Sequence, residues 1–235
     1  LLYSARIIPH RGSWLDFEFD HKNILFARID RKRKLHATVI LKALGLLNTD
    51  ILKEFYKVDE IILDKKGNFK RKLDFDLLIG TRATIDILHP KTGEVIIKKG
   101  RKFSKPSIVK MNEAHIKELP IMLEEIIGKV SLEDVADPKT AEVLVGANEA
   151  LSEGKINDLI AAGVKSIKCL YIDMIGHGDQ MRNTLLIDKT EGREDALIKI
   201  FERLRPGEPP TLEAAEALFQ GLFFNPERYD LSRVG

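Results

Sequence analysis

The alternation of apolar and polar residues predicts the first element of this chain. In WLDFEFD, residues 14–20, every second position is apolar, so a strand would place Leu15, Phe17 and Phe19 on one face. Trp14, the only tryptophan of the chain, then shares the opposite face with three acidic residues. The largest apolar side chain is thus predicted to lie on the polar side of a strand, directly after an Arg-Gly-Ser turn.

Similar patterns predict the rest of the N-terminal region. The apolar run 35–47 and the amphipathic run 49–56 favour helices, and Asn48 or Thr49 would cap the second of them. Short strands are predicted at 4–10 and 24–30.

The middle of the chain predicts a smaller set of strands and helices. Residues 84–100 alternate around a Pro/Gly turn, which is typical of two short strands. A helix is predicted from Ser152 as its N-cap to Gly163 as its end, followed by a strand at 164–173. No repeat with a period of tens of residues is apparent.

Two helices dominate the C-terminal region, at 194–204 and 212–224. The loop between them cannot continue either helix, because each proline lacks an amide donor and fixes its own φ angle. We expect this loop to be short, stiff and exposed, and Thr211 to cap the second helix. Its residues are Arg205, Pro206, Gly207, Glu208, Pro209, Pro210 and Thr211.

Composition narrows the possible classes. The 235 residues suit one large domain or two small ones, and 38 basic against 36 acidic residues leave no bulk charge to attract nucleic acid. The single cysteine, Cys169, excludes an internal disulfide and favours a reducing compartment, and no apolar run reaches the roughly 20 residues of a membrane span. The chain is therefore expected to be cytoplasmic. Because it begins without a methionine, we expect it to be part of a longer protein.

Candidate catalytic chemistry is sparse. The six histidines show no spacing typical of a zinc site, and Cys169 lies in an apolar strand pattern that favours a small buried side chain over a nucleophile. A basic run stands out, at Arg31, Lys32, Arg33 and Lys34. It would bind phosphates if the side chains project together, or form a solvated turn with Asp30 as partner. Trp14 has two interpretations as well, a lid over a small cluster or a platform for a base.

Three long motifs resemble the β subunit of bacterial RNA polymerase. They are YSARIIPHRGSWLDFEFD, NILFARIDRKRKLHATVILKALG and, at the far end, RLRPGEPPTLEAAEALFQGLFFNPERYDLSRVG. The resemblance is tight in the outer regions and looser in the middle. It implies a mixed α+β lobe (β2) domain, discontinuous over 1–56 and 177–235, interrupted by a smaller α/β-type insertion at 57–176 similar to βi4, also called sequence insertion 1. His10 stands where the family has Tyr, and His36 where it has Pro.

The resemblance also implies a function. The lobe forms one side of the main DNA cleft of a nucleotidyltransferase, with no catalytic centre of its own, since the catalytic Mg²⁺ is held by the β′ subunit. By resemblance, Trp14 stacks on a non-template base, Arg205 and Arg228 line the same single strand, and Arg205–Thr211 form a gate loop facing the clamp. Arg31–Lys34 would be a further DNA-facing patch.

The implied partners are promoter and downstream DNA, the β′, α and ω subunits and a sigma factor, in the nucleoid-associated cytoplasm and away from membranes. The acids beside Trp14 would repel backbone phosphate and leave its ring open to a base. An alternative is a protein-docking module, in which the inserted domain binds transcription regulators and the isolated chain does not bind DNA.

Overall fold

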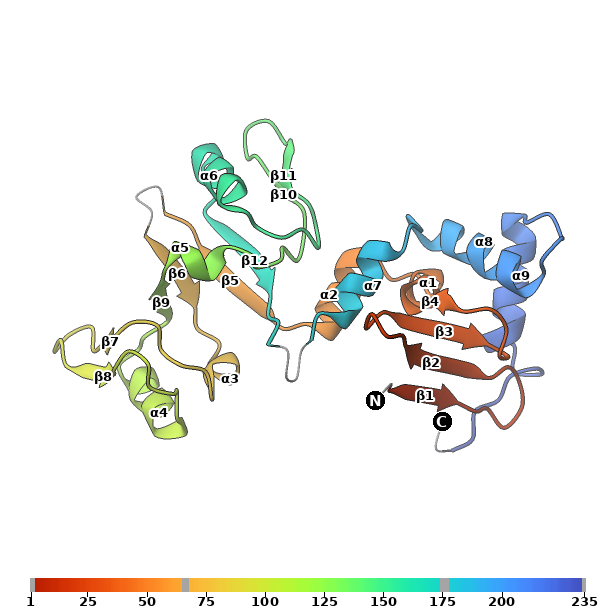
Figure 1. Cartoon of the computed structure of the whole chain (residues 1–235), viewed down its shortest axis with the longest axis horizontal. Coiled ribbons are helices and arrows are strands. Elements are labelled where there is room, and N and C mark those ends of the chain that lie inside the picture. Colours follow the sequence, from red (N-terminus) through yellow and green to blue (C-terminus); the bar gives the residue numbers. More distant parts are fainter. Residues whose placement is uncertain (1–2, 65–67, 174–177, 234–235) are drawn as a thin grey trace. The chain divides into compact units, whose positions relative to one another are not determined.

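The chain folds into two compact units, in a computed structural model that describes residues 3–64, 68–173 and 178–233. The first unit comprises Leu1–Phe55 and Asp173–Gly235, and the second comprises Tyr56–Ile172 (Figure 1). The predicted mixed α+β class is confirmed. The sequence placed the divisions after residues 56 and 176, and the second of these lies outside the described residues.

An antiparallel sheet forms one layer of the first unit. Its strands run in the order β1-β2-β3-β4, so each pairs with the next along the chain. The three strands predicted at 4–10, 14–20 and 24–30 are confirmed, and Leu15 and Phe17 do face the core. The strands are β1 (Ser4–Ile7), β2 (Leu15–Phe19), β3 (Leu25–Ile29) and β4 (Leu35–His36).

Five helices accompany this sheet within the described part of the first unit. The two predicted C-terminal helices are confirmed as α8 and α9, whereas α7 was not predicted. The helices are α1 (Ala37–Ala43), α2 (Asn48–Phe55), α7 (Gln180–Ile187), α8 (Arg193–Leu204) and α9 (Leu212–Phe223).

Two helix boundaries differ from the sequence prediction. The run 35–47 begins as strand β4, paired with β3, and its helix stops before Gly45, whose φ of +99° is left-handed and suits glycine. Helix α2 already includes Asn48 and Thr49, so neither is its cap. The side chain of Asp50, within the first turn of α2, accepts a hydrogen bond of 3.0 Å from the Leu47 amide.

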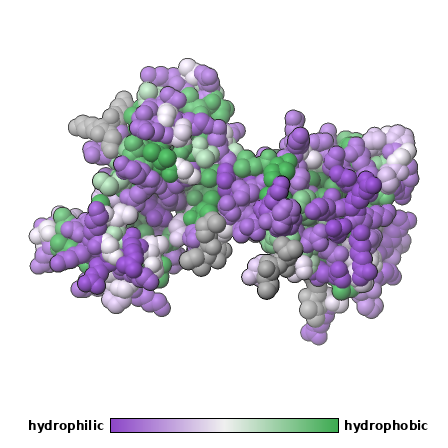
Figure 2. Space-filling model, viewed as in Figure 1, coloured by the Kyte–Doolittle hydropathy of each residue, from purple (hydrophilic) through white to green (hydrophobic). Residues whose placement is uncertain are grey.

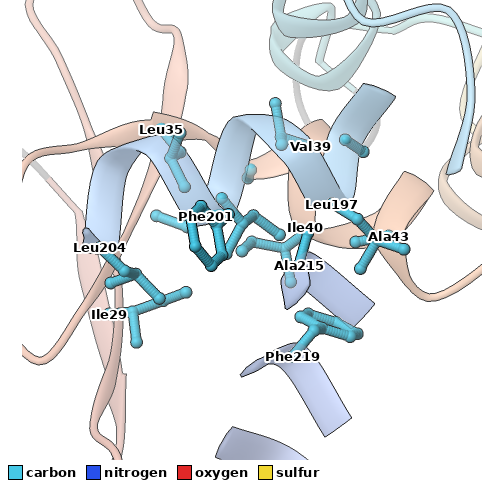
Figure 3. Close-up of a cluster of buried hydrophobic side chains, with 14 of the residues drawn as sticks. Ile29, Leu35, Val39, Ile40, Ala43, Leu197, Phe201, Leu204, Ala215 and Phe219 are labelled. Atoms are coloured by element: carbon cyan, nitrogen blue, oxygen red, sulfur yellow. The ribbon is translucent and has the colours of Figure 1, made fainter. Parts of the chain in front are cut away.

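The core of the first unit lies where α1, α8 and α9 meet the sheet (Figure 3). Helix α8 buries Leu197, Phe201 and Leu204, which recur at helical spacing and so share one face. Phe219 of α9 is 2% exposed and belongs to the same cluster. Each such side chain contributes about 1.5–3 kcal/mol by leaving water, and this packing fixes the loop between α8 and α9 at the edge of the core.

A buried ion pair joins α1 to the segment between α7 and α8. Lys42 Nζ lies 3.0 Å from Asp188 Oδ2, and the two side chains are 2% and 1% exposed. Thr38 Oγ1 donates to the same carboxylate at 2.7 Å, as does Thr190 Oγ1. A buried charge is tolerated only when it is paired and hydrogen-bonded, and both conditions hold here.

The second unit is built around a sheet of order β12-β5-β6-β9, with two separate hairpins, β7-β8 and β10-β11. The predicted hairpin at 84–100, the helix capped by Ser152 and the strand after it are confirmed. Hydrophilic side chains cover most of the surface in view (Figure 2). The elements are β5 (Val58–Ile62), β6 (Phe69–Lys72), α3 (Phe75–Leu78), β7 (Ile87–Leu88), β8 (Val95–Ile97), α4 (Lys105–Glu113), β9 (Glu118–Ile121), α5 (Leu123–Ile126), β10 (Val135–Ala136), β11 (Val143–Val145), α6 (Glu153–Ala162) and β12 (Ser166–Leu170).

The second unit also contains an internal repeat, so the prediction of no repeat is wrong. The series α3-β7-β8-α4-β9 recurs as α5-β10-β11-α6-β12, and each element starts 48 residues after its counterpart, as Ile87 and Val135 show. Equivalent details recur too. Ser104 and Ser152 cap α4 and α6. Asp86 and Asp134 accept backbone amides across their hairpins at 2.7 and 2.6 Å.

Candidate nucleic-acid interface

The Arg-Gly-Ser turn before β2 packs against the end of the chain. His10 and Asp230 are joined by a backbone hydrogen bond of 2.8 Å, and the Asp230 amide donates to the Arg11 carbonyl at 2.8 Å. Gly12 has a φ of +126°, and a Cβ placed there would lie 2.5 Å from Tyr229 Cδ2. Only glycine permits this close approach, which brings residues 10–12 next to residues 228–230.

A cavity of about 600 Å³ lies beside this contact, and we call it the groove. Gly12, Ser13 and Asp30 line one part of it. Arg205 and Arg228 line other parts, so two cations that the sequence separates by 23 positions border the same space. The family resemblance implied that both arginines contact nucleic acid, and the fold brings them together next to the turn that precedes Trp14.

Trp14 is half-buried and held in place by Asp30. The Trp14 amide donates to Asp30 Oδ1 at 2.8 Å, and the Asp30 amide donates to the Trp14 carbonyl at 2.9 Å. Two guanidinium groups lie over the indole ring. The Cζ atom of Arg31 is 4.9 Å from the ring centre, and that of Arg6 is 5.4 Å from it. The ring is therefore flanked by cations, a favourable arrangement for an aromatic face.

The acids of β2 do not create the negative surface that the sequence predicted around Trp14. Strand pairing places both Arg6 of β1 and Arg28 of β3 opposite Asp16, and Arg28 reaches Glu18 diagonally along β2. Arg6 hydrogen-bonds to the Asp16 carboxylate, and Arg28 pairs with Glu18 at 2.9 Å. The prediction that acids repel phosphate here is wrong, because arginines from neighbouring strands neutralise two of them.

Asp20, the third acid of the predicted polar face, is engaged by the backbone. Its Oδ1 accepts the amides of Ile24 and Lys22, each at 2.9 Å. The hydrogen bond from Ile24 is the main reason why the pKa of Asp20 lies below its ordinary value. Its charge thus stabilises the turn between β2 and β3.

The predicted gate loop is exposed along its whole length, Arg205–Thr211. Thr211 caps α9 as predicted, with its side chain accepting the Ala214 amide at 3.2 Å, and Gly207 has a left-handed φ of +95°. Arg205 ends α8, and its Nη1 lies 3.3 Å from Glu208 Oε2. Such an exposed pair contributes little to stability, so the Arg205 side chain can exchange Glu208 for another anion at small cost.

Arg228 is exposed beside α9. A Cβ on Gly221 would lie at an ordinary van der Waals distance of 3.6 Å from its Nη1, so the guanidinium lies against α9 at Gly221. Among the residues that the structure describes, no carboxylate forms an ion pair with Arg228. Its charge is available at the groove.

The basic run 31–34 does not form one common surface. Arg31 lies over Trp14, whereas Lys32 Nζ donates to the carbonyl of Leu204 at 2.9 Å, at the negative end of α8. Lys34 Nζ lies 3.9 Å from the centre of the Phe26 ring, and Arg33 lines a different cavity. Of the four, only Arg31 contacts Trp14.

Other candidate chemistry is limited in the described ranges. Cys169 is fully buried, and this burial raises the pKa of its thiol to about 12, which agrees with the predicted role as a small core residue. Over residues 3–64, 68–173 and 178–233, no three His, Cys, Asp or Glu side chains gather as a metal site would require. None of the helices in these ranges is long and apolar enough to cross a membrane.

Sequence reasoning missed three contributors to this interface. Arg6 reaches Trp14 from β1, Asp30 holds its backbone, and Tyr229 packs against Gly12. Alternation within β1 and β2 shows which residues share a face, but only the antiparallel register of the two strands shows that Arg6 lies opposite Asp16.

Comparison with known proteins defines the class. Residues 2–88 match the family model "RNA polymerase Rpb2, domain 2". The whole chain is 63% identical over 235 residues to the DNA-directed RNA polymerase subunit beta of Geobacter sulfurreducens, 60% to that of Geobacter sp. strain M21 and, over 236 residues, 51% to that of Sorangium cellulosum. In each case all of this chain is covered, and it spans 17% of the relative's length.

The matched domain and the mixed α+β unit identify a domain of the multisubunit RNA polymerase type. More particularly, the chain belongs to the family of bacterial RNA polymerase β subunits and corresponds to one segment of them.

Proposed function

We propose that the first unit is a lobe of RNA polymerase that contacts the non-template single strand of promoter DNA along the groove. The observation that carries this proposal is a cavity that Arg205 and Arg228 line together with Ser13, which precedes Trp14, and Asp30, which holds the Trp14 backbone. A stacking platform next to cations is the usual composition of single-strand sites.

The contacts of each side chain define its proposed role in binding DNA. Trp14 supplies an aromatic face, where stacking contributes about 1–3 kcal/mol per base and tolerates many sequences. Arg31 covers that ring in the absence of DNA and would move aside to pair with a phosphate. Arg205 and Arg228 would neutralise phosphates farther along the strand.

The loop Arg205–Thr211 is proposed to act as a gate. It projects from the core packing of α8 and α9, is exposed throughout, and contains three prolines that limit its conformations. A stiff exposed loop can narrow an entry path without a large ordering cost on closure.

For the whole protein we propose DNA-templated RNA synthesis in the cytoplasm, together with β′, α, ω and sigma subunits. No catalytic role is assigned to this chain, and the Mg²⁺ of nucleotidyl transfer would belong to β′. Residues 56–172 would be an inserted domain, and its compactness and repeated architecture also suit a surface for transcription regulators.

Fluorescence of the single tryptophan tests the DNA contact directly. Titration of the chain with single-stranded oligonucleotide should quench Trp14 emission at low salt, and the quenching should weaken as salt increases. Duplex DNA of equal length is the control, and it should quench less. Folded chain without any quenching would contradict intrinsic DNA binding and favour the docking-module function.

A further inference from the structure

A second cavity in the first unit, of about 810 Å³, is rich in basic residues and is separate from the groove. We call it the basic cavity. Two carboxylates and six cationic side chains line it. The cations come from the β3–β4 region, from the segment between α7 and α8, and from α8 itself: Arg28, Arg33, Lys34, Lys189, Lys199 and Arg203.

The two carboxylates of the basic cavity are already engaged. Asp188 is paired with Lys42 at 3.0 Å and accepts two threonine hydroxyls, and Asp195 Oδ2 accepts the Glu191 amide at 3.2 Å. The charge of Asp188 is thus balanced by Lys42, and Asp195 offsets one of the six positive charges. The cavity retains a strong attraction for an anion.

Several cations of the basic cavity are not committed to a partner. Within the described part of the chain, Arg33 and Lys189 form no ion pair or hydrogen bond through their side chains, and both are exposed. The Nε atom of Arg203 is buried and has no acceptor. By contrast, Arg28 pairs with Glu18 at 2.9 Å and Lys199 with Glu202 at 3.3 Å. A buried donor without a partner is uncommon in folded proteins and calls for an explanation.

The environment of His36, on the wall of the basic cavity, is consistent with this excess of positive charge. Burial is the main reason why the pKa of His36 lies below its ordinary value, and the cations of Lys34, Lys42 and Arg203 lower this pKa further. Asp188 opposes these effects. A bound anion would raise the pKa of His36, which makes this residue a local reporter.

We propose that the basic cavity binds a compact polyphosphate, such as inorganic tripolyphosphate or the phosphate chain of a nucleotide. Arg33 and Arg203, which form no ion pair among the described residues, offer the planar, forked donors that match phosphate oxygens. The cations border one space of about 810 Å³, which favours a small ligand of high charge over a duplex, whose phosphates are spread along a backbone. This inference does not depend on the proposed DNA contact at the groove.

Calorimetric titration of the full chain with inorganic tripolyphosphate tests the proposal. We expect one site per chain and binding at least tenfold weaker for inorganic phosphate, which carries less charge. The double variant Arg33→Gln/Lys189→Gln should bind tripolyphosphate at least tenfold more weakly. Both residues are exposed, so the fold should persist.

The matched control is Lys98→Gln/Lys99→Gln in the second unit, which removes the same charge from two exposed lysines and should alter affinity less than twofold. Histidine NMR should show the pKa of His36 rising on binding. Equal weakening by both double variants, an unchanged His36, or absence of binding would overturn the proposal. So would displacement of tripolyphosphate by duplex DNA at equal phosphate concentration, which would make the basic cavity a contact site for the DNA backbone.

Titration with ATP in place of tripolyphosphate distinguishes the two sources of the phosphate chain. Tighter binding of ATP would indicate that the ligand is a nucleotide, and equal binding would indicate recognition of the phosphate chain alone.

Discussion

The guanidinium carbon of Arg31 lies 4.9 Å from the centre of the Trp14 indole ring. Arg31 is exposed and has a left-handed φ of +58°, directly after Asp30, which holds the Trp14 backbone. The turn between β3 and β4 thus places a cation on the aromatic face proposed to receive a base. A cation–π contact of an exposed residue stabilises by only about 0.5–1 kcal/mol, so stacking by a base can displace it.

Removal of Arg205 or Arg228 should change the salt dependence of DNA binding. Arg205→Ala and Arg228→Ala each delete one cation at the groove. The slope of log K against log salt should fall in magnitude by about one for each phosphate that the variant no longer neutralises. Binding titrations of single-stranded DNA over a range of salt concentrations measure this slope. An unchanged slope with a penalty that depends on the base would instead mean that the arginine reads a base edge.

Loosening the gate loop should affect DNA entry more than stability. Replacement of Pro206, Pro209 and Pro210 by glycine frees backbone angles in an exposed loop and should cost about 1 kcal/mol or less per site. In assembled polymerase we expect faster, less discriminating DNA entry and a shorter open-complex lifetime. Stopped-flow kinetics on promoter DNA measure both, and wild-type values for both would count against a gate.

The Lys42–Asp188 pair should make the stability of the first unit depend on pH. Burial alone would raise the pKa of Asp188, but hydrogen bonds from Thr38, Thr190 and Lys42 outweigh it, and the pKa lies below the ordinary 3.8. A lowered pKa in the folded state means that the contribution is complete above pH 3.8 and disappears as the pH falls through the folded value.

Asp188→Asn should therefore destabilise the chain by about 3–5 kcal/mol at pH 7, because it leaves the Lys42 charge buried without its counterion. The difference from wild type should narrow as the pH falls below 3.8. Urea denaturation at a series of pH values tests this, with Asp179→Asn at the start of α7 as a control that should show a much smaller effect. A constant difference at all pH values would exclude Asp188 as the titrating group.

Residues 56–172 should fold alone, and the first unit should fold when they are replaced by a short linker. Each unit has its own hydrophobic cluster, Ile61 and Phe69 being members of one and Phe201 of the other. Thermal unfolding of both shortened chains should be cooperative. Gradual, non-cooperative melting of both would contradict the proposal of an inserted domain.

Local chemistry made much of the fold predictable. Ser152 and Thr211 were found as helix caps because a cap depends on residues three positions away, and the strand at Leu15–Phe19 follows from its own alternation. The electrostatics around Trp14 were mispredicted because Arg6 and Arg28 reach the acids of β2 through strand pairing, which sequence spacing does not reveal.

The repeat in the second unit was missed for a related reason. Its longest identical run is short, Pro90–Thr92 against Pro138–Thr140, and Gly93 is replaced by Ala141 at a position with positive φ. The apolar positions agree in character rather than identity, as at Met111 and Leu159, which are both fully buried. Shared backbone geometry is what makes the two copies recognisable.

The effect of Trp14→Ala on promoter opening tests the central proposal most directly. In assembled polymerase, this variant should weaken open-complex binding by roughly 1–3 kcal/mol while leaving the salt slope nearly intact, because it removes a platform but no charge. Trp14→Phe should recover part of the binding, and Tyr3→Ala, which truncates an aromatic residue that is 70% exposed, is the control. The stability of the isolated chain should fall by less than the about 3–5 kcal/mol typical of core aromatic truncations. Severe destabilisation together with unaltered promoter opening would contradict the account and make Trp14 a structural residue.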